Sequence, residues 1–204
     1  MLAFLTQTFA DLMARGGPVM WVLLLLSIVA VTLSFERGWF WLRTNHPRRR
    51  AMLDEAGRML RSGRLEDARR FAASDQSVYG RLVARLAESR DAASAPIDAI
   101  EAERPHIERF MPTLSTVITA APMLGILGTV LGLIAALNIM GTDQSITDPR
   151  QISPAIGEAL ISTAAGLVVA LIVLFPYNAF RAQISRTLGR FEALVEAAVG
   201  TDDS

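Results

Sequence analysis

Three long apolar stretches constrain this chain more than any other feature of its sequence. They cover residues 16–35, 110–142 and about 156–180, and only the third contains a charged residue, Glu158 near its start. A helix needs about 20 apolar residues to cross a hydrocarbon core of about 30 Å. The pattern therefore predicts an all-α integral membrane protein with three transmembrane helices.

The predicted organisation follows from these stretches. We expect an amphipathic N-terminal helix outside the membrane, a helical cytoplasmic segment between the first two spans, a short outer loop between the last two, and a cytoplasmic C-terminal helix and tail. In chain order, the predicted segments are 1–15, 16–36, 37–110, 111–141, 142–154, 155–180 and 181–204. The second stretch would be roughly 50 Å long as a helix. The second and third helices are therefore expected to extend into the cytoplasm.

The basic residues indicate the direction of the spans. All 20 are arginine, and 18 of them fall on one predicted side, all except Arg15 and Arg150. Because positive residues accumulate in cytoplasmic segments, the N-terminus is expected outside and the C-terminus in the cytoplasm. Residues near the inner end of the first span are expected to anchor it at the interface. These residues are Trp39, Trp41, Arg48, Arg49 and Arg50.

The cytoplasmic segment is predicted to be a set of short helices. Ser62-Gly63 should end one helix, a second should begin at Leu65, and Ser74-Asp75 should cap a third. From Pro96 the helical pattern is expected to continue directly into the second span. Acids are interleaved with the arginines, so a nucleic-acid-binding role is not favoured.

The composition argues against several classes of function. The sequence has no cysteine and two histidines far apart, His46 and His106, so a metal site or a histidine-based catalytic site is not expected. It has no nucleophile–base pair and no cofactor motif. The glycines near Gly128 lack the Lys-Ser/Thr of a phosphate loop. The sequence thus predicts a non-enzymatic protein without a cofactor.

The second span carries glycines at helical spacing. Gly125, Gly128 and Gly132 would let a neighbouring helix approach closely in lipid. Thr129 lies among them, and it has two readings. It is either a polar residue of an ion pathway or a side chain that only bonds the carbonyl of Gly125 in its own helix. Pro122 is expected to bend this span.

The third span has a partly polar stripe. Glu158, Ser162 and Gly166 are each four residues apart, and Thr163 lies on the adjacent stripe. A carboxylate in a span is a functional candidate because burying a charge there costs about 2.5–3.5 kcal/mol. The alternative is that Glu158 lies at the outer interface and solvates the helix start. Pro176 is expected to bend the inner end.

Two segments together resemble a known family. The run from Ala121-Pro122 to Gly132 and the run from Gly157-Glu158 to Tyr177-Asn178 are similar to the second-span and third-span signatures of the TolQ/ExbB/MotA proton-channel family. Three spans resemble the TolQ/ExbB branch. One position departs from the family pattern, which usually has a proline where this chain has Ile172. The inner end of the third helix is therefore expected to bend at a different place, because its proline comes one turn later, at Pro176.

The resemblance implies a function and partners. It implies a ring of copies, five in the best-known members, in the bacterial inner membrane. The second and third spans would line a pore that holds a dimer of a small single-span protein resembling TolR or ExbD. Thr129, Glu158 and Thr163 match the polar pore positions, and the transported ion would be H⁺. Such a motor would energise an envelope process. The competing hypothesis is a passive oligomeric scaffold in which Glu158 pairs structurally.

Overall fold

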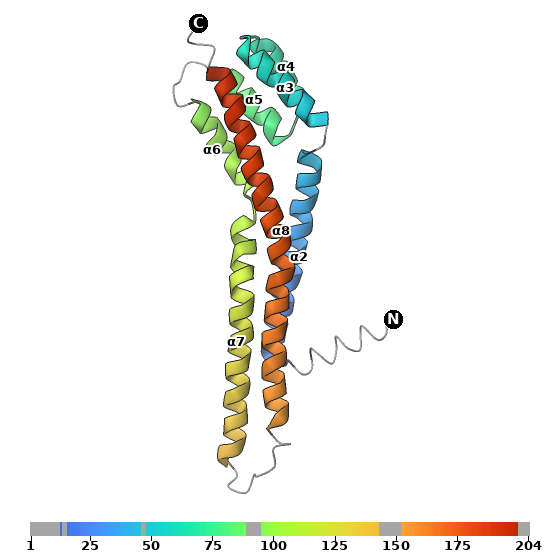
Figure 1. Cartoon of the computed structure of the whole chain (residues 1–204), viewed down its shortest axis with the longest axis vertical. Coiled ribbons are helices and arrows are strands. Elements are labelled where there is room, and N and C mark those ends of the chain that lie inside the picture. The colour runs from blue at the N-terminus through green and yellow to red at the C-terminus, as the bar shows by residue number, and fades with distance from the viewer. Residues whose placement is uncertain (1–12, 14–15, 46–47, 89–94, 143–151, 200–204) are drawn as a thin grey trace, which may run out of the picture. The chain divides into compact units, whose positions relative to one another are not determined.

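The computed structural model describes residues 13, 16–45, 48–88, 95–142 and 152–199, and the elements among them are helices (Figure 1). Three predictions fall mainly outside these residues. They are the amphipathic helix at 1–15, the outer loop at 142–154 and the tail after residue 199. The side chains of Arg48, Arg49 and Arg50 also lie outside the description.

Three helices are long and apolar enough to cross a membrane. They are α2 (Gly17–Thr44), α7 (Met111–Thr142) and α8 (Ser153–Val199). This confirms the predicted fold class. In α2 and α7 only 22 % of the most apolar window is buried. The remaining apolar surface is what lipid or other helices contact in a membrane protein.

The chain divides into two compact units. The first, here the spanning unit, comprises Met1–Phe35 and Pro112–Tyr177. The second, here the bundle unit, comprises Glu36–Met111 and Asn178–Ser204. The bundle unit contains four shorter helices in addition to the ends of α2 and α8. They are α3 (Arg48–Arg61), α4 (Leu65–Ser74), α5 (Val78–Glu88) and α6 (Ala95–Ile107).

The third span was predicted at 155–180 with an extension at its inner end, and a C-terminal helix and tail were predicted at 181–204. In the structure, helix α8 joins the span and the C-terminal helix. It runs for 47 residues without a break, and Pro176 lies inside it. The physical reason lies in the bundle unit. There Ile184, Thr187, Phe191 and Leu194 recur at helical spacing and are all buried. Burial of this stripe stabilises the helical conformation of residues beyond the membrane span, so α8 is longer than a bilayer requires.

Helix α5 forms the centre of the bundle unit. Its residues Tyr79, Leu82 and Val83 are fully buried. The rings of Tyr79 and Phe191 pack edge to face with centroids 5.5 Å apart. The Tyr79 hydroxyl donates to Thr187 at 3.4 Å and accepts from Arg190 at 3.0 Å. A buried tyrosine thus keeps its polar end satisfied while its ring fills the core.

The short helices begin and end partly as expected. The predicted break at Ser62-Gly63 is confirmed, because α3 ends at Arg61 and Gly63 has a φ of 67°. The predicted cap of α5 at Ser74-Asp75 is wrong. Ser77 precedes α5, and its hydroxyl accepts from the Tyr79 backbone N–H at 3.3 Å. Asp75 instead accepts from the Ser77 N–H at 3.0 Å and shapes the turn before the cap.

The predicted continuous helix from Pro96 into the second span is also wrong. Helix α6 ends at Ile107, α7 begins at Met111, and Phe110 between them has a φ of 64°. A proline explains the break. Pro112 has no N–H to donate to the carbonyl of Glu108, four residues earlier, and a proline without that bond is tolerated in the first turn of a helix, where Pro112 lies in α7.

A buried arginine occupies the end of α6. Arg37 is 2 % exposed and donates to the carbonyl oxygens of His106 at 3.1 Å and Ile107 at 3.5 Å. Its guanidinium lies 4.4 Å from the ring centroid of Phe40 and 5.7 Å from that of Phe110. The positive charge therefore satisfies helix-terminal carbonyls that the break leaves without helical partners.

The two tryptophans predicted as interfacial anchors differ in how far their side chains are exposed. Trp39 is 60 % exposed, and the Arg43 guanidinium lies 4.9 Å from its ring centroid. Trp41 is 5 % exposed and packs inside the bundle unit. Only Trp39 therefore presents its ring outward. Anchoring at the interface remains a prediction for the whole group.

Candidate functional site

The candidate site lies in the spanning unit, where α7 and α8 touch through small residues. A Cβ added at Gly125 would lie 3.0 Å from both the Ser162 carbonyl oxygen and Thr163 Cα. One added at Gly132 would lie 2.7 Å from Ala159 Cβ. Real Cβ atoms rarely come this close. The two backbones can pack at this distance because these positions are glycine.

The same contact continues on both sides of Gly125. A Cβ added at Gly128 would overlap the Ser162 hydroxyl, and one added at Gly166 would overlap the Ala121 carbonyl oxygen. The structure thus brings together the residues predicted for helix packing. We call this contact the glycine seam, and it comprises Gly125, Gly128, Gly132, Ser162 and Gly166.

Two hydroxyl groups of α8 reach a carbonyl of α7. Thr163 donates to the Gly125 carbonyl oxygen at 2.9 Å. Ser162 donates to the Ala159 carbonyl oxygen of its own helix at 2.8 Å, and it lies 3.4 Å from the same Gly125 oxygen. Gly125 therefore carries both the closest backbone approach and the polar link between the helices. Hydrogen bonds of this kind between helices in a membrane contribute about 1 kcal/mol.

Thr129 lies apart from these hydroxyls. It donates to the Ile126 carbonyl oxygen, three residues earlier, at 2.5 Å. From the sequence, the expected acceptor of a bond within the helix was the Gly125 carbonyl oxygen. That oxygen is instead taken by Thr163 from α8. Thr129 is only partly buried, so its hydroxyl has a bond within its own helix and also faces the surface of the spanning unit.

Glu158 lies against α2 instead of the glycine seam. A Cβ added at Gly17 would overlap the Glu158 carboxylate, and Gly17 has a φ of 68°. Gly17 begins α2, and Glu158 lies five residues after the start of α8. The amino end of a helix carries partial positive charge, which favours a carboxylate there. This placement near two helix starts is compatible with an ion-pathway role and with solvation of the helix end.

Two polar residues of α7 were missed by the sequence reasoning. Thr116 and Thr119 are exposed in an apolar helix and donate to carbonyls one turn earlier, at 2.9 Å for Thr116 with Pro112. Exposed hydroxyls in a span are better placed against water or protein than against lipid tails. Their spacing of three residues in an uncharged stretch was the available signal.

Comparisons with known proteins identify a family and several relatives that this chain resembles. A family model described as the MotA/TolQ/ExbB proton channel family matches residues 67–193. The biopolymer transport protein ExbB-like 1 of Synechocystis is 36 % identical over 207 residues, covering 98 % of this chain and 80 % of that protein. ExbB-like 3 of the same organism is 30 % identical over 191 residues, covering 91 % and 89 %.

A relative from a second group matches a shorter region. The Tol-Pal system protein TolQ of Pseudomonas aeruginosa is 35 % identical over 112 residues. That match covers 52 % of this chain and 48 % of the relative. The family match spans most of α4 to α8 and includes the whole glycine seam.

Proposed function

Because this chain belongs to the MotA/TolQ/ExbB proton channel family, we propose that it is the pore-forming subunit of an inner-membrane motor driven by the proton-motive force. The observation that carries the proposal is the arrangement around Gly125. Two helices pack backbone to backbone there, and a side-chain hydroxyl crosses between them. A rigid helix pair with polar groups beside it is a suitable wall for an ion pathway.

The proposed pathway residues are Thr129, Glu158 and Thr163. Within the described parts of α7 and of α8 up to Tyr177, Glu158 is the one charged residue. A complete relay through about 30 Å of hydrocarbon needs further polar groups. We therefore infer that a second chain supplies a carboxylate. A dimer of small single-span proteins of the TolR/ExbD kind, held inside a ring of about five copies, would meet that need.

The energy available to such a motor is sufficient. One proton that crosses 100 mV of membrane potential releases about 2.3 kcal/mol. That amount exceeds thermal energy several-fold and can bias the partner helices between packed states. The proposed orientation has the N-terminus outside and the C-terminus in the cytoplasm. The driven process would be work on the cell envelope, with H⁺ as the proposed ion.

A passive oligomeric scaffold is the second candidate. The placement of Glu158 against the start of α2 favours it, because that carboxylate could simply stabilise a helix end. The two candidates differ in what a conservative change at Glu158 does. A motor loses conduction while the complex still assembles, whereas a scaffold loses function only when assembly fails.

The experiment combines native mass with proton flux. The protein is purified in mild detergent with its co-purifying chains, and the complex is reconstituted into vesicles that report internal pH. We expect Glu158→Gln and Thr129→Val to leave the mass unchanged and to reduce proton flux at least tenfold. Thr32→Val is the matched control, since Thr32 also bonds its own helix, to the Ile28 carbonyl oxygen at 2.8 Å. Unchanged flux in both pathway variants would favour the scaffold.

A further inference from the structure

The bundle unit has an apolar groove between α6 and α8. The groove has a volume of about 620 Å³. Ile97 and Ile100 of α6 and Val195 and Val199 of α8 line it. Ile97 is 67 % exposed and Val199 is 53 % exposed. Large aliphatic side chains that remain open on a surface mark a place where another protein surface docks.

The rim of this groove is acidic. It carries three glutamates, Glu101, Glu192 and Glu196, against one arginine, Arg104. Arg104 is ion-paired with Glu101 at 3.3 Å. Glu192 and Glu196 are one helical turn apart on α8, and neither has an ion pair within the described chain. Two negative charges beside an apolar floor select a surface that is both apolar and basic. They disfavour anionic lipid headgroups.

A basic surface lies on the other side of α8. Figure 1 shows α6 on one side of the C-terminal part of α8 and the α3–α4 hairpin on the other. The hairpin carries two exposed arginines, Arg61 and Arg70, that form no ion pair among the residues the structure describes. We call the exposed surface of this hairpin the basic face. Three of its arginines are paired with three of its acids, and beyond those pairs it carries Arg61 and Arg70 against one exposed acid, Asp54.

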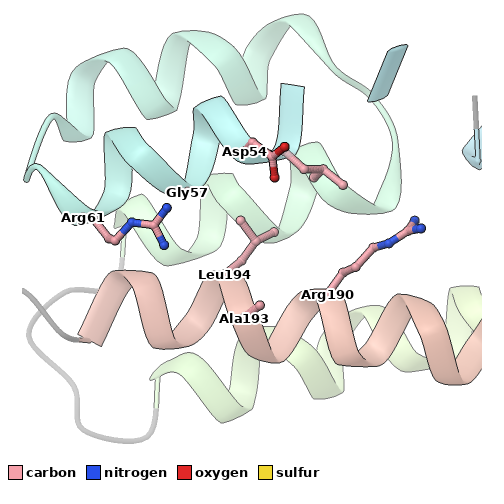
Figure 2. Close-up of a pocket in the computed structure, with 7 residues that line it drawn as sticks. Asp54, Gly57, Arg61, Arg190, Ala193 and Leu194 are labelled. Carbon is pink, nitrogen blue, oxygen red and sulfur yellow. The ribbon is translucent and has the colours of Figure 1, made fainter. Parts of the chain in front are cut away.

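The basic face includes a smaller hollow between α3 and α8. This hollow has a volume of about 380 Å³, and Leu53, Leu194 and the acidic Asp54 help to line it. Figure 2 shows Arg61 at one end and Arg190 at the other. Arg190 is already held by Tyr79 and Asn45, at 3.0 and 3.3 Å, so Arg61 is the cation left for a partner.

We propose that the α6–α8 groove of one copy receives the basic face of a second copy of this chain. The inference rests on the ring of copies in the proposed function and names the two surfaces through which neighbouring copies touch. A closed ring requires a heterologous contact, in which two different patches on each copy are complementary. The acidic groove and the basic face lie on opposite sides of α8 and have opposite charge. The two surfaces are therefore different from each other and complementary in charge, as a heterologous contact requires.

The proposal is tested by charge reversal combined with cysteine crosslinking. The sequence has no cysteine, so every introduced thiol reports one position. Two differently tagged versions are co-expressed in the native membrane with the full complex, one with Ile97→Cys and one with Met52→Cys on α3. The membranes are isolated and treated with an added thiol oxidant, because cytoplasmic thiols are otherwise kept reduced, and we then expect a disulfide-linked dimer that carries both tags.

Charge reversal then identifies the two surfaces. Glu192→Arg with Glu196→Arg should abolish the crosslink, as should Arg61→Glu with Arg70→Glu. A ring in which every copy carries all four reversals should recover it. Glu88→Arg, at an exposed glutamate of α5 outside the groove, is the matched control and should leave the crosslink intact.

The outcomes separate this inference from the proposed function. An oligomeric wild-type complex whose crosslink is absent, or is unaffected by both reversals, would overturn the groove assignment while the ring stands. A crosslink from Ile97→Cys to the smaller subunit would also overturn it, because the groove would then serve that partner. A monomeric wild-type protein by native mass would overturn both proposals.

Discussion

The spanning unit and the bundle unit are both helical, yet they pack by different means. In the spanning unit, α7 and α8 touch through glycine, alanine and serine, and an added methyl group would collide at several positions. In the bundle unit, large side chains such as Tyr79 and Phe191 fill the space between helices. Arg37 and Glu103 are also buried there.

We propose that the difference follows from the solvent that each unit meets, lipid for the spanning unit and water for the bundle unit. Lipid tails are as apolar as leucine, so helices in a membrane gain little from burying large aliphatic side chains. Close backbone approach and dispersion contacts remain as the source of stability. In water, burial of apolar surface contributes about 25 cal/mol per Å². This stabilisation can offset the cost of a few buried charges in a unit that lies in water, provided that the charges are paired.

The largest expected effect tests the paired charge in the bundle unit. Glu103 is 1 % exposed and accepts from Arg81 at 2.7 Å, while Arg85 lies 3.7 Å away. Arg81→Ala should destabilise the bundle unit by about 3 kcal/mol, since it leaves a buried carboxylate without its main partner. Hydrogen exchange in α5 and α6 measures this loss. Glu103→Leu, which removes the charge itself, should cost less, and the reverse order would contradict the interpretation.

A smaller loss is expected when the glycine seam is widened. Gly166→Ala places a methyl group on the Ala121 carbonyl oxygen and should cost about 1–3 kcal/mol through overpacking. Gly189→Ala in the same helix meets nothing within 4 Å and should stabilise α8 slightly, by up to about 1 kcal/mol. Thermal unfolding in detergent compares the two. Equal effects would show that close approach does not hold α7 and α8 together.

The polar link between α7 and α8 should matter less than their close approach. Thr163→Val removes the bond to the Gly125 carbonyl oxygen and is expected to cost about 0.6–1.7 kcal/mol. Thr32→Val loses a bond within one helix and should change stability by less than about 0.5 kcal/mol. Unfolding of both variants in the same detergent is the measurement. A larger loss in Thr32→Val would reverse the ranking.

The smallest effect is expected at an exposed ion pair of the bundle unit. Arg58 and Glu55 are paired on α3, with side chains 64 % and 42 % exposed. Arg58→Ala should cost less than about 0.5 kcal/mol, and high salt should remove the difference, because solvent screens exposed charges. A loss as large as that of Arg81→Ala would mean that burial does not set the strength of ion pairs in this unit.

Several features of the fold were predictable because they depend on local chemistry. Apolar stretches of sufficient length gave three long helices, and Gly63 ended α3 at the expected place. The glycines and small residues of α7 and α8 were expected to pack, and the structure places them in contact. The break before α7 was missed, although Pro112 was visible, because the helical pattern on both sides obscured it.

The partners of polar groups were not predictable. Thr129 was expected to bond Gly125 if it bonded its own helix, but Thr163 takes that carbonyl from another helix. Arg37 is one of many arginines in the sequence, and nothing local marks it as the one that caps α6. Such choices depend on which distant residues arrive together.

The sequence by itself determined the class of protein, the number of spans and the residues small enough to pack in lipid. It could do so because hydropathy and side-chain size are properties of each residue and its near neighbours. Only the tertiary structure decided which residues of α8 are buried in the bundle unit, that Glu158 lies against Gly17, and that an acidic rim borders the groove between α6 and α8. Each of these requires contacts between residues far apart in the chain, and their energies exist only once the helices have packed.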